Sequence, residues 1–157
     1  MNYQITGLNR ANFVGLFGLS DAELAARSIL RLTAEKSATA RFPCRISLRD
    51  ADAGESVLLL NFEHLPVASP YQSRHAIYIR ENANDAKLAI NEIPEIMLNR
   101  PLSIRAFDHA GMLVDADLAM GDNLAPTLER LIAGRGAAYL HVHNAKHGCF
   151  VARVDRA

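Results

Sequence analysis

The sequence has no tryptophan, and aromatic residues make up only 6% of its 157 residues. Proteins that bind single-stranded nucleic acid stack bases on aromatic side chains, so this composition argues against such a role. The chain also lacks a charge excess, because 17 basic side chains balance 17 acidic ones. Proteins that bind nucleic acid or an anionic membrane usually carry a basic excess. We therefore expect no nucleic-acid partner and no membrane partner.

Long apolar segments and export signals are also missing. The densest apolar run, Val57 to Leu60, is far shorter than the roughly 20 residues that cross a bilayer. Residues 1–10 contain no basic run followed by an apolar core, which is the pattern of a secretory signal. These absences predict a cytoplasmic protein.

Cysteine is scarce, since Cys44 and Cys149 are the only two and they form no CxxC pair. In a reducing cytoplasm both are expected to be free thiols, although a disulfide between them stays open. The sequence contains no glycine-rich phosphate loop, zinc ribbon or EF-hand loop. It therefore indicates no cofactor.

The remaining composition is that of an ordinary globular domain. Half of the residues are apolar, and no repeat, charge block or change in composition divides the chain. A chain of this length buries enough surface to form a core without a metal or disulfide. We expect one domain over residues 1–157.

Three segments carry helix signals. Ser20 and Glu23 have the spacing of a capping box, which predicts a helix over residues 20–27. A stripe of leucine and isoleucine side chains predicts a second helix over residues 123–133. Residues 94–98 are expected to form a third, short helical turn.

Seven further segments are rich in apolar and β-branched residues and predict strands, at residues 28–33, 57–62, 75–80, 102–107, 112–120, 138–143 and 149–154. Turns rather than crossover helices join most of them, which favours antiparallel pairing. The predicted class is α+β, with a mixed, largely antiparallel sheet and two or three short helices.

The segment Asp108 to Gly111 is typical of a type I turn between two of these strands. The register that brings apolar partners together places Arg105 opposite Asp115. We therefore expect an ion pair between these two side chains.

The most suggestive chemistry lies in the C-terminal hairpin. His141 and His143 alternate with apolar residues, so they point to the same face of their strand. A five-residue loop between the two strands places Cys149 opposite His143. In this register Tyr139 and Arg153 share the face of the histidines.

Three interpretations of this face stay open, and the sequence favours the first. In the first, the histidines are half-buried strand residues that are hydrogen-bonded to neighbours. In the second, Cys149, His143 and His141 are the reactive groups of a polar or catalytic pocket, because a histidine can stabilise a nucleophilic thiolate. In the third, His141 and His143 bind a transition metal with the help of a remote ligand. The spacing alone supplies no such ligand, so no metal is expected.

Remote candidates flank a proline-containing loop at residues 65–72. Glu63 and His64 precede the loop and His75 follows it. Binding residues are often carried on loops that a rigid scaffold positions, so these side chains could form the edge of a pocket. We expect Tyr139 and Arg153 to line the same pocket.

Two classes of function fit these patterns. The first is a small-molecule enzyme or ligand-binding domain whose pocket is lined by histidine and cysteine at the C-terminal hairpin. The alternative is a non-catalytic homodimeric interaction module, which would use an exposed strand edge or an apolar patch. Whether the protein is an enzyme stays open.

Several segments also resemble a bacterial family known as domain of unknown function 1203. They are Leu16 to Arg27, Pro43-Cys44-Arg45, Ser47-Leu48, Asp50-Ala51, Glu63 to Pro66, Ser69-Pro70-Tyr71, Gly111-Met112, Val114-Asp115-Ala116, His141 to Ala145, Gly148-Cys149-Phe150 and Ala152 to Arg156. The resemblance covers essentially the whole chain, and its ending is the most specific part. It implies a small bacterial single-domain protein without an assigned activity, and it supplies no catalytic residues.

Overall fold

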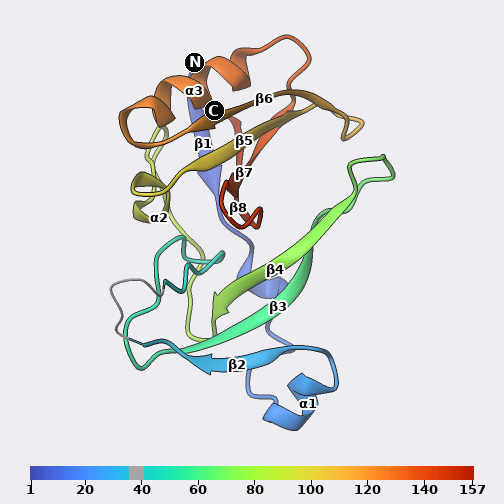
Figure 1. The fold of residues 1–157 in the computed structure, drawn as a ribbon, viewed down its shortest axis with the longest axis vertical. Coiled ribbons are helices and arrows are strands. Elements are labelled where there is room, and N and C mark those ends of the chain that lie inside the picture. Colours follow the sequence, from blue (N-terminus) through green and yellow to red (C-terminus); the bar gives the residue numbers. More distant parts are fainter. Residues whose placement is uncertain (36–40) are drawn as a thin grey trace.

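The strands of the protein form two antiparallel sheets, seen in the upper and lower halves of Figure 1. The computed structural model describes residues 1–35 and 41–157. One sheet has five strands in the order β1-β8-β7-β5-β6, and the other has three in the order β2-β3-β4. The α+β class and the antiparallel pairing are confirmed, with the strands divided between two sheets.

The larger sheet consists of β1 (Tyr3–Thr6), β5 (Leu102–Phe107), β6 (Leu113–Ala119), β7 (Tyr139–Asn144) and β8 (Phe150–Arg156). The smaller sheet consists of β2 (Leu30–Thr33), β3 (Ser56–Leu65) and β4 (Ser73–Arg80). The α-helices are α1 (Asp21–Ala25), α2 (Glu95–Leu98) and α3 (Leu124–Ala133). Every predicted helix and strand has a counterpart here, whereas β1 has no clear signal in the sequence.

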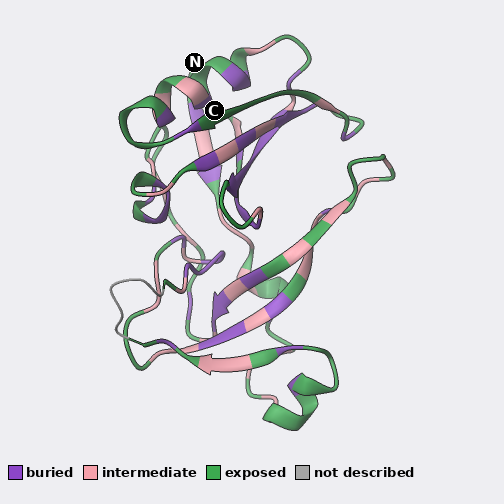
Figure 2. Cartoon of the chain, in the orientation of Figure 1, coloured by how far each residue is buried: buried purple, intermediate pink, exposed green. Residues whose placement is uncertain are grey.

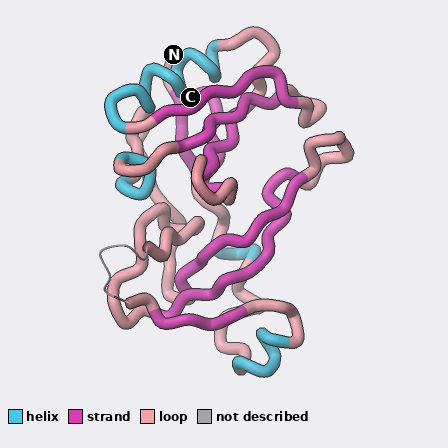
Figure 3. The backbone as a smooth tube through the Cα atoms, in the orientation of Figure 1, coloured by secondary structure: helices cyan, strands magenta, loops and turns pink. Residues whose placement is uncertain are grey.

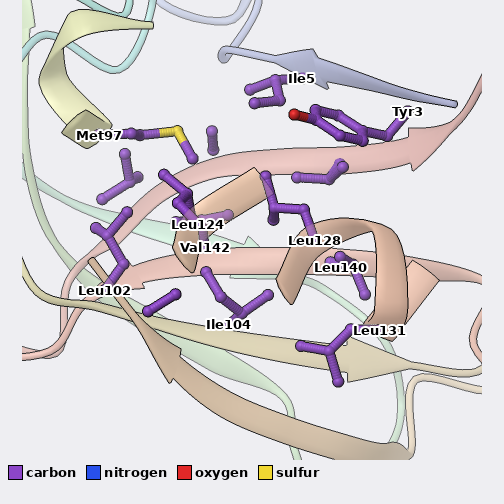
Figure 4. Packing of buried hydrophobic residues seen from close by; sticks show 14 of the residues in the cluster. Tyr3, Ile5, Met97, Leu102, Ile104, Leu124, Leu128, Leu131, Leu140 and Val142 are labelled. Carbon is purple, nitrogen blue, oxygen red and sulfur yellow. The ribbon is translucent and has the colours of Figure 1, made fainter. Parts of the chain in front are cut away.

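Helix α3 covers one face of the five-stranded sheet (Figure 1). Its buried stripe packs against apolar side chains of β1, β5 and β7, and Figure 4 shows part of this core, including Leu128, Ile104 and Val142. Each fully buried side chain of this kind contributes about 1.5–3 kcal/mol through removal from water. Within the described ranges, no helix is long and apolar enough to cross a membrane.

A second apolar core lies on the three-stranded sheet. Leu24 of α1 packs there with residues such as Phe13, Leu58 and Ile77. The predicted capping box is confirmed, because Ser20 Oγ accepts a hydrogen bond from the Glu23 amide and the Glu23 carboxylate accepts one from the Ser20 amide. These contacts fix where α1 begins.

The hairpin formed by β7 and β8 extends from the larger sheet toward the smaller one (Figures 1 and 3). All six residues of β7 are buried, as are most of β8 (Figure 2). A third apolar cluster bridges the two sheets, with Leu65 from β3, Phe107 from β5 and Tyr139 from β7. The two sheets are therefore in contact at this cluster, and the candidate site lies at the same junction.

The expected ion pair between Arg105 and Asp115 is wrong. A β-bulge at Val114 shifts the register, so that Arg105 lies opposite Ala116. Asp115 pairs instead with Arg130 of α3, at 3.8 Å. The turn pattern in the sequence does not show that one strand contains an extra residue. One extra residue moves the following side chains of that strand to the opposite face of the sheet.

The expected register of the C-terminal hairpin is also wrong. Val142 lies opposite Ala152, whereas His143 lies opposite Phe150, and the extra residue Val151 forms a bulge between them. Phe150 therefore shares the face of the histidines, and Cys149 does not. The expectation that the cysteines are free thiols is confirmed, since both are unpaired and buried.

Candidate metal centre

Three histidines from the two sheets meet at the junction. His64 comes from β3, and His141 and His143 come from β7. One ring nitrogen of each histidine lies within 4.8 Å of a ring nitrogen of both others. The ring centroid of His64 lies 4.9 Å from that of His143 and 5.6 Å from that of His141. His64 is thus the remote partner that the spacing of the hairpin could not identify.

Each of these histidines has a buried ring nitrogen without a hydrogen-bond partner. The atoms are Nδ1 of His64, Nδ1 of His141 and Nε2 of His143. An unsatisfied buried polar atom costs about 1–3 kcal/mol, and such atoms are uncommon in folded proteins. Three of them on neighbouring rings are available to a ligand.

The tautomer of His143 is determined by its surroundings. Its Nδ1 lies 2.9 Å from the carbonyl oxygen of Gly148. A carbonyl oxygen only accepts hydrogen bonds, so Nδ1 carries the proton and Nε2 keeps a free lone pair. Histidines that bind metals are commonly oriented by such a hydrogen bond from their other ring nitrogen.

Burial keeps all three rings neutral at pH 7. It lowers the pKa of His64 to about 4 and the pKa values of His141 and His143 to about 3. The positive charge of Arg105 acts in the same direction on each ring. Neutral imidazole is the form that binds metal ions, so the site needs no deprotonation before a metal binds.

Two phenylalanine rings hold the histidines in place. Phe150 stacks on His64, with ring centroids 5.1 Å apart and an angle of 7° between the planes. The same ring meets His141 edge to face at 5.0 Å, and Phe107 meets His141 at 5.4 Å. These contacts cover one side of the cluster with apolar rings.

Arg105 supplies an unneutralised positive charge beside the cluster. It lies opposite His141 in the pairing of β5 with β7, and its side chain is half-buried. Its guanidinium Nε donates a hydrogen bond to Ser103 Oγ at 3.3 Å. No carboxylate of the described residues lies within ion-pair distance of it. The charge is available to an anionic ligand.

The cluster offers three nitrogen ligands of the type that binds zinc. Zinc–nitrogen bonds of about 2.0–2.1 Å at tetrahedral angles place ligand nitrogens about 3.3 Å apart. The histidine χ2 torsion is broad, so ring rotation can shorten the present separations of up to 4.8 Å. Among the residues that the structure describes, no cysteine or carboxylate completes the set. Three protein ligands with one open position are typical of catalytic zinc sites.

The other predicted site residues are distributed around the cluster rather than in it. Tyr139 packs on His141, and the guanidinium of Arg153 lies 4.0 Å from the centre of the Tyr139 ring. Glu63 accepts a hydrogen bond from Gln72 at 2.8 Å. His75 lines a separate cavity instead.

Cys149 also lines that separate cavity, so its predicted position beside His143 is wrong. Its sulfur accepts hydrogen bonds from Arg45 Nη2 and Asn144 Nδ2, each at 3.1 Å. The bulge at Val151 is the physical reason, because it turns the Cys149 side chain to the opposite face.

The sequence patterns did not identify three functional candidates, which are Arg45, Arg105 and Phe150. Arg45 lies in an irregular segment, where arginine is normally exposed, and nothing local signals its burial. Arg105 was assigned an acidic partner by the wrong register. The predicted register, with Cys149 opposite His143, puts Phe150 on the other face of the strand. The bulge at Val151, which no glycine marks in the sequence, brings Phe150 to the face of the histidines.

The chain was compared with known proteins. No curated protein and no solved structure matches it. A family profile described as "Protein of unknown function (DUF1203)" matches residues 41–156, a range that includes the three histidines, Arg45 and Cys149. The match covers well over half of the chain, which therefore belongs to the DUF1203 family of proteins of unknown function.

Proposed function

We propose that the protein binds one divalent transition metal ion through His64, His141 and His143. The observation that carries this proposal is the meeting of three neutral imidazoles, each with a buried ring nitrogen that has no partner. Zinc is the best match, because it accepts nitrogen ligands in tetrahedral geometry and imposes no further geometric preference. Imidazole ligands also suit copper, nickel and iron, so metal analysis is part of the test.

We further propose that the centre acts on a small anionic molecule. Three protein ligands would leave one coordination position open, and Arg105, the strand partner of His141, would offer a cation near the metal. A carboxylate or phosphate could place one oxygen toward the metal and another toward Arg105. The metal would supply Lewis acidity to the bound group. Phe150 and Phe107 would keep water away from the other side of the histidines.

The position of the site gives metal binding a structural consequence. His64 belongs to the three-stranded sheet, whereas His141 and His143 belong to the five-stranded sheet. A metal bound to all three would join the two sheets. Because the unfolded chain does not hold the ligands together, binding would stabilise the folded state.

Metal analysis of protein purified without chelators tests the proposal. We expect one zinc ion per chain, and we expect it to be lost in His64→Gln and in His143→Gln. The matched control is His109→Gln, because His109 is exposed in the turn after β5. Absence of stoichiometric metal, together with failure to take up added zinc, would contradict the proposal. Equal zinc content in all three variants would place the metal elsewhere.

A second candidate function is self-association through β6. This strand is an edge of the five-stranded sheet, and its apolar side chains Val114 and Leu118 are exposed. An open strand edge can pair with the same strand of a second copy. Sedimentation that shows a monomer at high micromolar concentration would rule this function out, and a dimer lost in Leu118→Lys would support it.

A further inference from the structure

The structure contains a large cavity that the histidine cluster does not line. Its volume is about 770 Å³, within the usual range for small-molecule sites. Residues of both sheets and of the connecting segments surround it, including Arg45, Tyr78, Arg100, Lys146 and Cys149. Cys149 is 9% exposed and lines this cavity.

The Cys149 sulfur lies against a buried guanidinium. Arg45 is 1% exposed, and its Nη2 donates to Cys149 Sγ at 3.1 Å. Its other hydrogen bonds go to the backbone carbonyls of Phe150 and Pro43, which are neutral. Asn144 Nδ2 is the second donor to the sulfur, also at 3.1 Å.

A buried charge is strongly disfavoured unless an opposite charge accompanies it. No carboxylate among the described residues lies within ion-pair distance of Arg45. Burial lowers the pKa of Arg45, and a negative charge on Cys149 is the main influence in the opposite direction. Arginine stays protonated in proteins, and the sulfur of Cys149 is the ionisable group that Arg45 contacts. A thiolate there would balance the buried charge and accept the hydrogen bonds from Arg45 and Asn144.

The cavity also carries more positive than negative charge. Its lining has four basic side chains, Arg41, Arg45, Arg100 and Lys146, against the two carboxylates of Asp50 and Glu95, so a positive excess remains when Cys149 is a thiolate. Asp50 is already shared between two of them, with contacts of 3.3 Å to Arg41 and 3.5 Å to Arg100. A small anion is therefore attracted into the cavity.

We propose that Cys149 is a nucleophilic thiolate with Arg45 as its counter-ion, and that the cavity admits small molecules with a carboxylate next to an electrophilic carbon. In the reaction, Sγ attacks that carbon and a sulfur–carbon bond forms. The bond from carbon to the leaving group breaks, and the leaving group departs with the bonding electrons. The thiolate carries no proton to transfer, and no oxidant or reductant takes part. The step uses none of the three histidines, so it is independent of the metal centre.

Alkylation rates test this inference with two matched reagents. Iodoacetate carries a carboxylate next to its electrophilic carbon, whereas iodoacetamide is neutral, and both lose iodide. A free thiolate with a negative charge nearby, such as glutathione, reacts more slowly with the anionic reagent because like charges repel. We expect Cys149 to show the opposite preference. We also expect it to react with iodoacetate about tenfold faster than glutathione at pH 7, where a free thiol is only a few per cent ionised.

Variants of the cavity residues show which side chains determine the alkylation rate and which determine the preference for iodoacetate. Peptide mass spectrometry identifies the alkylated cysteine. Arg100→Gln is expected to lose the preference for iodoacetate and to keep its rate with iodoacetamide. Asn144→Ala and Arg45→Met are expected to lower the alkylation rates with both reagents. If Arg45→Met does not fold, Asn144→Ala alone tests whether the donors to the sulfur are needed. Cys44→Ser and His109→Gln are the controls and should leave both rates unchanged. A Cys149 rate no faster than that of glutathione, or a preference for iodoacetamide, would overturn the proposal.

Discussion

His64 and His143 lie edge to face with ring centroids 4.9 Å apart, although they belong to different sheets. His143 is fixed by its hydrogen bond to the Gly148 carbonyl, and His64 is fixed by its stack on Phe150. Gly148 and Phe150 flank Cys149, so one short segment supports the histidines and also presents the thiol to the cavity. The junction of the two sheets thereby carries both candidate sites.

Zinc should stabilise the protein against unfolding. At a free zinc concentration 100 times the Kd, binding to the folded state adds about 2.7 kcal/mol. For a chain of this size that corresponds to a rise in Tm of about 5–10 °C. Thermal unfolding of chelator-treated protein, with and without added zinc, measures the effect. The rise should vanish in His64→Gln and persist in His109→Gln, and an equal rise in both variants would place zinc elsewhere.

Acid should destabilise the metal-free protein well above the pH at which carboxylates titrate. The folded-state pKa values of His141 and His143 are about 3, below the unfolded value of about 6.5, so between these limits the unfolded chain binds more protons. Stability therefore falls as the pH falls below about 6.5, and between pH 7 and pH 5 these two histidines remove about 3–4 kcal/mol. His64, whose pKa is lowered to about 4, acts in the same direction.

Urea unfolding at pH 7, 6 and 5 measures this loss of stability. His109→Gln should show the same pH dependence as the natural sequence, because the side chain of His109 is exposed. His141→Leu should show a smaller one. Stability that is constant from pH 7 to pH 5 would mean that the histidines are not buried in neutral form.

Replacement of Arg105 by glutamine should change metal and anion binding in opposite directions. Its charge opposes protonation of all three histidines, and it opposes a metal cation for the same reason. Arg105→Gln is therefore expected to tighten zinc binding several-fold in anion-free buffer and to weaken phosphate binding to the zinc-loaded protein. Calorimetric titration measures both affinities. The control is Arg27→Gln, because Arg27 is exposed in the turn after α1. Weaker zinc binding in Arg105→Gln would contradict the assignment.

The packing of α3 on the larger sheet gives a test of the fold itself. Leu128 is fully buried, whereas Leu118 on β6 is 69% exposed. Leu128→Ala should lower the free energy of unfolding by about 2–5 kcal/mol, because it leaves a cavity in the core. Leu118→Ala should change it by no more than about 0.5 kcal/mol. Chemical denaturation compares the two, and equal losses would argue against this packing.

Much of the fold is predictable because its signals are local. The capping box of Ser20 and Glu23 and the apolar stripe of α3 depend on neighbours within one or two helical turns. By contrast, β1 is a four-residue edge strand that pairs with β8 at the other end of the chain. Nothing near Tyr3 in the sequence indicates that partner.

The candidate site was only partly predictable, because it depends on long-range contacts and on bulges. The shared face of His141 and His143 follows from strand alternation. The approach of His64 depends on how two sheets pack, which no spacing reveals. Because of the bulge at Val151, Cys149 faces Arg45 and not the histidines. The single pocket that the sequence predicts is therefore two separate candidate sites in the structure.

X-ray absorption at the zinc edge of the loaded protein reports the metal ligands themselves. We expect scattering from three imidazole rings with zinc–nitrogen distances of about 2.0–2.1 Å, and no sulfur at about 2.3 Å. His64→Gln should reduce the imidazole count or abolish binding. A sulfur ligand, or zinc surrounded mainly by water, would contradict the three-histidine centre.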